Sequence, residues 1–164
     1  MTDYVALGRL LMAAALMCLI AAFGNANAGD IDGTWRLKKR VLPDGTVLVP
    51  PAVAGMGTAI DGMRHLNVFW TRPDGRTGSV GLISKYRITA NTYSETLLAS
   101  AFDDGSGSPV ARGTSGETRT VPVTREGGRV SYQLPFDPPK VVYEGDTLTA
   151  TLEGAFVDYW ERVK

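Results

Sequence analysis

Short segments in which apolar and polar residues alternate recur from Gly33 to the end of the chain, and this period of two is the strongest constraint on the fold. Successive side chains of a β-strand point to opposite faces, so the alternation predicts strands with one buried face. The clearest segment is 80–88, and the segments 130–134 and 148–152 repeat its pattern. No segment after residue 28 shows convincing helical periodicity, so the sequence predicts an all-β protein.

Turn residues separate these segments. Pro-Asp-Gly tripeptides at 43–45 and 73–75 combine a proline that presets φ with a glycine that accepts positive φ. Ala90-Asn91 and Gly127-Gly128 also fit tight reversals. Short strands joined mainly by such reversals predict an antiparallel barrel or sandwich.

The first strand is expected to face inward through Trp35, Leu37 and Val41. Arg40 belongs to the alternate series, which we expect to face solvent. Lys39 interrupts the inward series, so it predicts either the rim of the sheet or a bulge.

The first 28 residues have the features of a secretory signal. An apolar run at 10–23 is followed by Ala26-Asn27-Ala28, an A-x-A-like cleavage site. The run is shorter than the roughly 20 residues that a membrane-spanning helix needs. We therefore expect a signal peptide over 1–28, cleavage after Ala28, and one domain over 29–164 in the periplasm or outside the cell. No transmembrane segment is expected after cleavage; an uncleaved anchor is the alternative.

Charge, cysteine and histidine content exclude several classes of function. The chain has 17 basic and 17 acidic residues, whereas a nucleic-acid-binding protein shows a basic excess or stripe. Cys18 is the only cysteine and lies in the predicted signal peptide, so the mature chain has no disulfide. His65 is the only histidine and does not make a histidine-rich metal site. We expect no nucleic-acid partner, no metal and no cofactor.

Several short motifs, taken in order, resemble the bacterial lipocalin-like domains of the calycin type. They are Gly33-Thr34-Trp35-Arg36-Leu37, Asp44-Gly45, the hairpin at 86–95, Gly145-Asp146-Thr147-Leu148 and Tyr159-Trp160-Glu161-Arg162-Val163. The resemblance spans nearly all of residues 29–164. It implies a secreted up-and-down antiparallel barrel of about eight to ten strands that encloses a cavity for a small apolar molecule. Because the chain ends two residues after Arg162, we expect no C-terminal helix.

The same resemblance gives Gly33, Trp35 and Arg162 a structural role. In the family pattern, an arginine of the last strand packs across the tryptophan of the first and closes the base of the barrel. Such a cation on an indole ring also covers apolar surface with a wettable group. The two residues are expected to meet because the sheet closes on itself.

Five aromatic residues and one acid are the candidates for ligand contacts. A buried carboxylate needs a partner, and Glu95 shares a strand face with Tyr93, so we expect it to point inward. Arg64, on the face of Leu66 and Trp70, is one candidate partner. Glu95 either has a structural role, in an ion pair or at a rim position, or it orients a ligand. The candidate ligand-binding residues are Trp70, Tyr86, Tyr93, Glu95, Tyr132 and Tyr159.

Three functions follow as hypotheses. The first is a non-catalytic periplasmic or secreted protein that binds a small apolar or amphipathic molecule inside the barrel, with no catalytic residue. The second is an envelope interaction module with a filled core, which would use either the long connections at 50–62 and 103–116 or an exposed strand edge. The third is a small-molecule isomerase or hydrolase, which would need Glu95 near His65. The sequence leaves the oligomeric state open.

Overall fold

The computed structural model describes residues 30–164, which form an all-β architecture. Thirteen strands make one antiparallel sheet, and no α-helix occurs in this part of the chain, which confirms the all-β and antiparallel predictions. Between residues 30 and 164 there is accordingly no helix with the length and apolarity to cross a membrane. The predicted signal peptide and its cleavage site after Ala28 lie outside the described residues.

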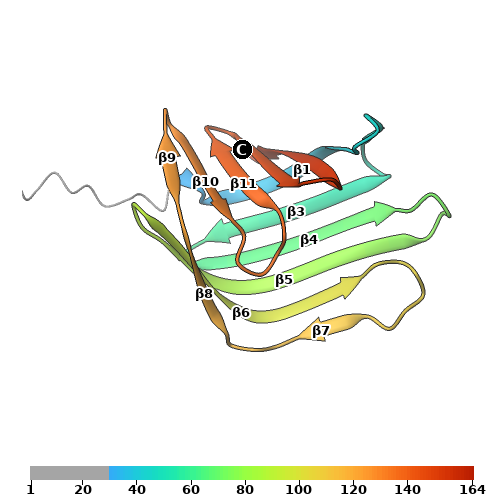
Figure 1. Ribbon diagram of the computed structural model, residues 1–164, viewed down its shortest axis with the longest axis horizontal. Coiled ribbons are helices and arrows are strands. Elements are labelled where there is room, and N and C mark those ends of the chain that lie inside the picture. The colour runs from blue at the N-terminus through green and yellow to red at the C-terminus, as the bar shows by residue number, and fades with distance from the viewer. Residues whose placement is uncertain (1–29) are drawn as a thin grey trace, which may run out of the picture.

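The N-terminal half of the sheet is a meander of long strands. β1, β3, β4, β5 and β6 lie side by side in this order, and the short β2 pairs with the end of β1 (Figure 1). Hairpins join β3 to β4, β4 to β5 and β5 to β6, as the turn residues predict. The bounds are β1 (Gly33–Val41), β2 (Val47–Leu48), β3 (Val53–Ile60), β4 (Met63–Thr71), β5 (Thr77–Ile88) and β6 (Thr92–Asp103).

The C-terminal half is a second meander, in which β9 to β13 pair in sequence order. Strands β7 and β8 both pair with β6, along different parts of its length. The bounds are β7 (Ala111–Gly113), β8 (Thr118–Pro122), β9 (Thr124–Glu126), β10 (Arg129–Gln133), β11 (Lys140–Glu144), β12 (Thr147–Leu152) and β13 (Phe156–Arg162).

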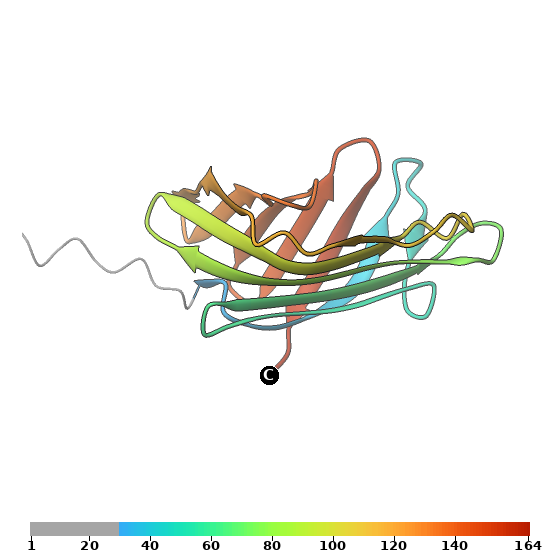
Figure 2. The ribbon, with the colours of Figure 1, turned by 90° about the horizontal axis from the view of Figure 1, so that it is seen from below.

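Pairing of the first strand with the last joins the two meanders. β1 and β13 are antiparallel neighbours, with Trp35 opposite Arg162 and Leu37 opposite Trp160. The sheet curls into an open half-barrel, so that β10–β13, orange to red, lie across from β3–β6, mostly green (Figure 2). The β1–β13 pair therefore lies in the middle of the curled sheet, whose edges are β7 and β9.

One extended segment reaches from one edge region to the other. β8 pairs with the start of β6, with Tyr93 opposite Val121. After Val123 the chain continues as β9, which pairs with the start of β10. The half-barrel is thus bridged at the end where β6 and β10 begin. The later half of β6 pairs with β5 on one side and with the short β7 on the other.

A bulge in β1 overturns the predicted orientation of Arg40. The register with β13 shifts between Leu37 and Lys39, so Lys38 is the extra residue and the alternation changes phase. Arg40 is buried inside the half-barrel with 8% of its surface exposed, while Val41 is only half-buried. The prediction that Lys39 marks a bulge or the rim was right to within one residue, but the orientations assigned to Arg40 and Val41 were wrong.

The core fills the inner face of the sheet and is rich in aromatic rings. Trp35, Leu37, Tyr93 and Trp160 are all buried and come from three strands, β1, β6 and β13. Burying one large apolar side chain contributes about 1.5–3 kcal/mol, so this cluster is a main source of stability in a fold without helices.

Candidate functional site

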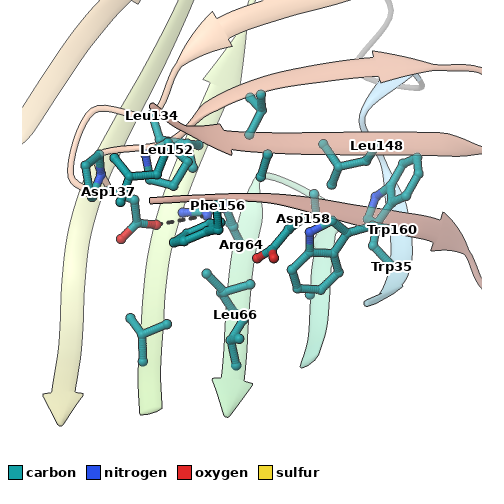
Figure 3. A pocket seen from close by; sticks show the side chains of 18 of the residues that line it. Trp35, Arg64, Leu66, Leu134, Asp137, Leu148, Leu152, Phe156, Asp158 and Trp160 are labelled. Carbon is teal, nitrogen blue, oxygen red and sulfur yellow. Dashed lines mark hydrogen bonds and ion pairs between the residues drawn. The ribbon is translucent and has the colours of Figure 1, made fainter. Parts of the chain in front are cut away.

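An apolar cavity of about 420 Å³ lies between the two halves of the curled sheet (Figure 3). One wall comes from β3 and β4, and the other from β11, β12 and β13. Both walls are formed by the inward-facing side chains, every second residue along each strand, which explains why the walls are apolar. Its apolar lining includes Leu66, Val68, Trp70, Leu148, Phe156 and Trp160.

Arg64 places a charged group in this wall, between two carboxylates. Its Nη1 donates to Glu95 Oε1 at 2.8 Å, and its Nη2 lies 3.2 Å from Asp137 Oδ2. Ser84 Oγ donates to the same Glu95 oxygen at 2.5 Å. Burial opposes the charge on Arg64, but the neighbouring carboxylates Glu95 and Asp137 raise the pKa of its guanidinium well above its ordinary value. Arg64 is therefore a fixed cation at the cavity wall (Figure 3).

Glu95 itself lies behind Arg64 and does not line the cavity. Its side chain is fully buried, and its second oxygen, Oε2, has no hydrogen-bond partner among the described residues. The hydroxyl of Tyr93 is also buried without a partner in this part of the chain. The structure thus shows Glu95 in an ion pair, which is one of the interpretations that the sequence left open.

A second ion pair lies in the cavity wall and was not predicted. Arg40 donates to Asp158 through Nε at 2.6 Å and through Nη2 at 2.7 Å, a bidentate arrangement. The guanidinium also stacks 3.8 Å from the ring centroid of Phe156. Burial raises the pKa of Asp158, and the bonds from Arg40 act in the opposite direction. The alternating pattern could not reveal this pair because the bulge at Lys38 reverses the orientation of Arg40.

A row of four tyrosines fills the bridged end of the half-barrel. Tyr93 stacks on Tyr132 at 4.3 Å between centroids, Tyr86 lies 6.1 Å from Tyr93, and Tyr143 lies 6.0 Å from Tyr132. Burial raises the pKa of all four hydroxyls. Of the four, only Tyr143 lines the cavity. Tyr143 was missed by the sequence analysis, although its alternation with Val141 on β11 was a usable signal.

The aromatic candidates therefore fall in three different places. Trp70 lines the cavity, while Tyr86, Tyr93 and Tyr132 pack in the tyrosine row beyond it. Tyr159 is 37% exposed, and Lys39 Nζ lies 4.7 Å from the centre of its ring. Because Tyr159 sits between the buried Asp158 and Trp160, its side chain points to the outer face.

Trp35 and Arg162 are in contact at the same end of the sheet. Arg162 Cζ lies 4.3 Å from the Trp35 ring centroid, and Tyr143 meets the indole edge-on at 5.3 Å. Gly33 has φ 133°, and a Cβ there would lie 2.5 Å from Arg162 Nη1. Gly33 therefore makes room for the guanidinium above the indole.

The geometry separates the residues that a catalytic interpretation needs. His65 is exposed and follows the inward-facing Arg64 on β4, so it points away from Glu95. No three His, Cys, Asp or Glu side chains within residues 30–164 are placed to hold a metal ion. What this site can do is bury an apolar molecule against two buried ion pairs.

Comparison with known protein families, with curated proteins and with solved structures found no match for this chain.

Proposed function

We propose that this chain is a non-catalytic, lipocalin-like protein of the periplasm or exterior that binds a small apolar or amphipathic molecule in the cavity. The single observation that carries the proposal is the apolar cavity of about 420 Å³ with two ion pairs in its wall. Ligand pockets typically span about 300–1,000 Å³, with apolar walls and a few placed polar groups. The tyrosine row supports this role because it gives the cavity a rigid inner end.

Closure of the barrel belongs to the same proposal. The segment from β8 to β9 already pairs with β6 and with β10, which lie near opposite edges of the curled sheet. Arg119, on β8, also donates to the carbonyl of Pro135 at 3.1 Å and stacks 4.5 Å from the Phe136 ring. These contacts support a barrel of the lipocalin type that is closed around its tyrosine end.

Native mass spectrometry of the protein purified from the cells that make it tests the proposal. We expect a discrete extra mass on the folded chain that is lost on denaturation, and a polypeptide that begins at Gly29. A folded chain carrying no extra mass would contradict a tightly held ligand. A chain that retains residues 1–28 would contradict the predicted cleavage and the location derived from it.

An interaction surface is the second candidate, and exposed side chains on the outer face favour it. Met56, Phe69 and Ile83 are each at least 40% exposed, on the neighbouring strands β3, β4 and β5. Exposed apolar patches of this kind commonly mark contacts with other proteins. Light scattering of the purified protein tests it: self-association that Phe69→Ser abolishes supports this function, and a monomer up to high concentration counts against a contact between copies.

A further inference from the structure

We propose that the ligand carries a primary ammonium group, which binds Asp137 while its apolar body fills the cavity. The inference rests on the proposed function, because it names the chemical class of the molecule that the cavity takes. It follows from the balance of buried charge, from the prolines that follow Asp137, and from the aromatic lining.

The charged groups at the cavity do not balance. Arg40, Arg64, Asp137 and Asp158 line it and sum to zero, and Glu95 behind Arg64 adds one further negative charge. Arg40 and Asp158 neutralise each other through two short hydrogen bonds. Arg64 alone therefore has to serve two carboxylates.

Of these two carboxylates, Asp137 is the less firmly held. Glu95 Oε1 accepts hydrogen bonds from Arg64 at 2.8 Å and from Ser84 at 2.5 Å, and the Glu95 side chain is fully buried. Asp137 contacts Arg64 through Oδ2 at the longer distance of 3.2 Å, and its side chain is 16% exposed at the cavity. Its second oxygen, Oδ1, accepts no hydrogen bond from the described residues.

The local sequence also denies Asp137 the usual backbone partners. An aspartate in a loop commonly accepts a hydrogen bond from the N–H of a residue that follows it. Here the next two residues are Pro138 and Pro139, which have no N–H to donate. Both prolines line the cavity beside Asp137, so this stretch of the wall offers a carboxylate without local donors.

A cation would relieve this imbalance, whereas an anion would increase it. A bound carboxylate would bring a fourth negative group to two guanidinium groups and would compete with Asp137 for Arg64. An ammonium group would donate to Asp137 and reduce the competition for Arg64. The rings of Tyr143 and Trp160 line the same cavity, and aromatic faces attract cations.

Three probes with one chain length test the inference: octylammonium, octanol and octanoate at neutral pH. All three tryptophans of the chain line the cavity, so their fluorescence reports its occupancy. We expect octylammonium to bind at least about tenfold more tightly than octanoate, with octanol between them, as one charge-assisted hydrogen bond would give.

The variant Asp137→Asn tests whether Asp137 causes the preference for octylammonium over octanoate. We expect this variant to bind octanol as the wild type does and to lose the preference for octylammonium. Asp61→Asn is the matched control, because Asp61 is exposed, has φ 52° and does not line the cavity. It should keep the wild-type order, and octanol binding verifies the fold of both variants.

The outcomes separate this inference from the proposed function. Octanoate binding as tightly as octylammonium would overturn the ammonium class and leave a binding protein. A preference that persists in Asp137→Asn would overturn the role of Asp137. Failure of all three probes to bind would overturn the proposed function together with the inference, whereas the expected order in the wild type would support both.

Discussion

Arg64 Nη1 lies 2.8 Å from Glu95 Oε1, although the two residues are on β4 and β6 and are separated by β5. Ser84 on the intervening β5 donates to the same oxygen, so three neighbouring strands meet at one carboxylate. A buried ion pair of this kind fixes the relative position of the strands that carry it. The pair also marks where the apolar cavity ends, since Arg64 lines that cavity and Glu95 does not.

Removing the cation from this pair should destabilise the fold strongly. Arg64→Met leaves Glu95 as a buried charge without its main partner, and we expect a loss of about 3 kcal/mol in the free energy of unfolding. Adding Glu95→Gln to this variant should recover part of the loss. Urea denaturation measures both. Arg129→Met, in an exposed pair with Glu144, is the control and should cost less than about 1 kcal/mol; an equal loss in both arginine variants would refute the assignment.

Gly78 should control the position of Trp70 in the cavity. A Cβ at Gly78 would lie 2.3 Å from Trp70 Cε2, so Gly78→Ala must displace the indole. We expect a red shift of tryptophan emission and a cost of about 1–3 kcal/mol from overpacking. Gly81→Ala on the same strand is the matched control, because the nearest atom to a Cβ there is 3.4 Å away. Unchanged emission from Gly78→Ala would show that Trp70 does not pack on Gly78.

The tyrosine row should limit stability at alkaline pH. Burial raises the folded-state pKa of Tyr86, Tyr93, Tyr132 and Tyr143 above the ordinary value of about 10. Above about pH 10 the unfolded chain therefore releases protons that the folded protein retains. The stability that is fully present below this pH is lost as the pH rises toward the folded pKa values.

Tyrosinate absorbance and circular dichroism, recorded together against pH, test the row. We expect most of the tyrosinate signal to appear only as the strands unfold. Tyr93→Phe keeps the ring and removes a buried hydroxyl that has no partner among the described residues, so its unfolding midpoint should move to higher pH. Ionisation in a folded protein of more than one of the five tyrosines between residues 30 and 164 would contradict the buried row.

Arg162 should protect Trp35 from solvent. Arg162→Ala removes the guanidinium 4.3 Å from the indole centre, and we expect a loss of about 1 kcal/mol in the free energy of unfolding. Acrylamide should quench tryptophan fluorescence more strongly in this variant. Arg36→Ala is the control, since Arg36 pairs with Glu161 at an exposed position; equal quenching in the two variants would argue against the stacking role.

The strands and the inward position of Glu95 could be predicted because both depend on local alternation. Tyr93 and Glu95 share a face of β6, and Arg64 shares a face with Leu66 and Trp70 on β4, as period two requires. The pairing of Glu95 with Arg64 then needed only that β4, β5 and β6 follow one another in an ordinary meander. These features survive in the structure because no bulge interrupts β4, or β6 before Leu97.

The lining of the cavity and the orientation of Arg40 could not be predicted, because they depend on a strand irregularity and on contacts between residues far apart in the sequence. One extra residue at Lys38 brings Arg40 inside to meet Asp158, 118 positions later in the sequence. Whether an inward aromatic side chain fills the core or lines a cavity depends on packing across the sheet. Trp70 and Tyr132 have the same strand pattern, yet only Trp70 reaches the cavity.

Binding of a small molecule in the cavity between the two halves of the sheet is the proposal on which the others depend. The most direct test is titration with the neutral apolar dye N-phenyl-1-naphthylamine, monitored by energy transfer from the tryptophans, for the wild type and two variants. Ala150→Phe fills the cavity from β12, and Thr151→Phe adds the same ring to the exposed face of the same strand. If the cavity binds the dye, we expect saturable binding to the wild type and to Thr151→Phe, and loss of binding in a folded Ala150→Phe protein. Equal binding of the dye to both variants would place it elsewhere and contradict the proposal that the cavity binds a small molecule.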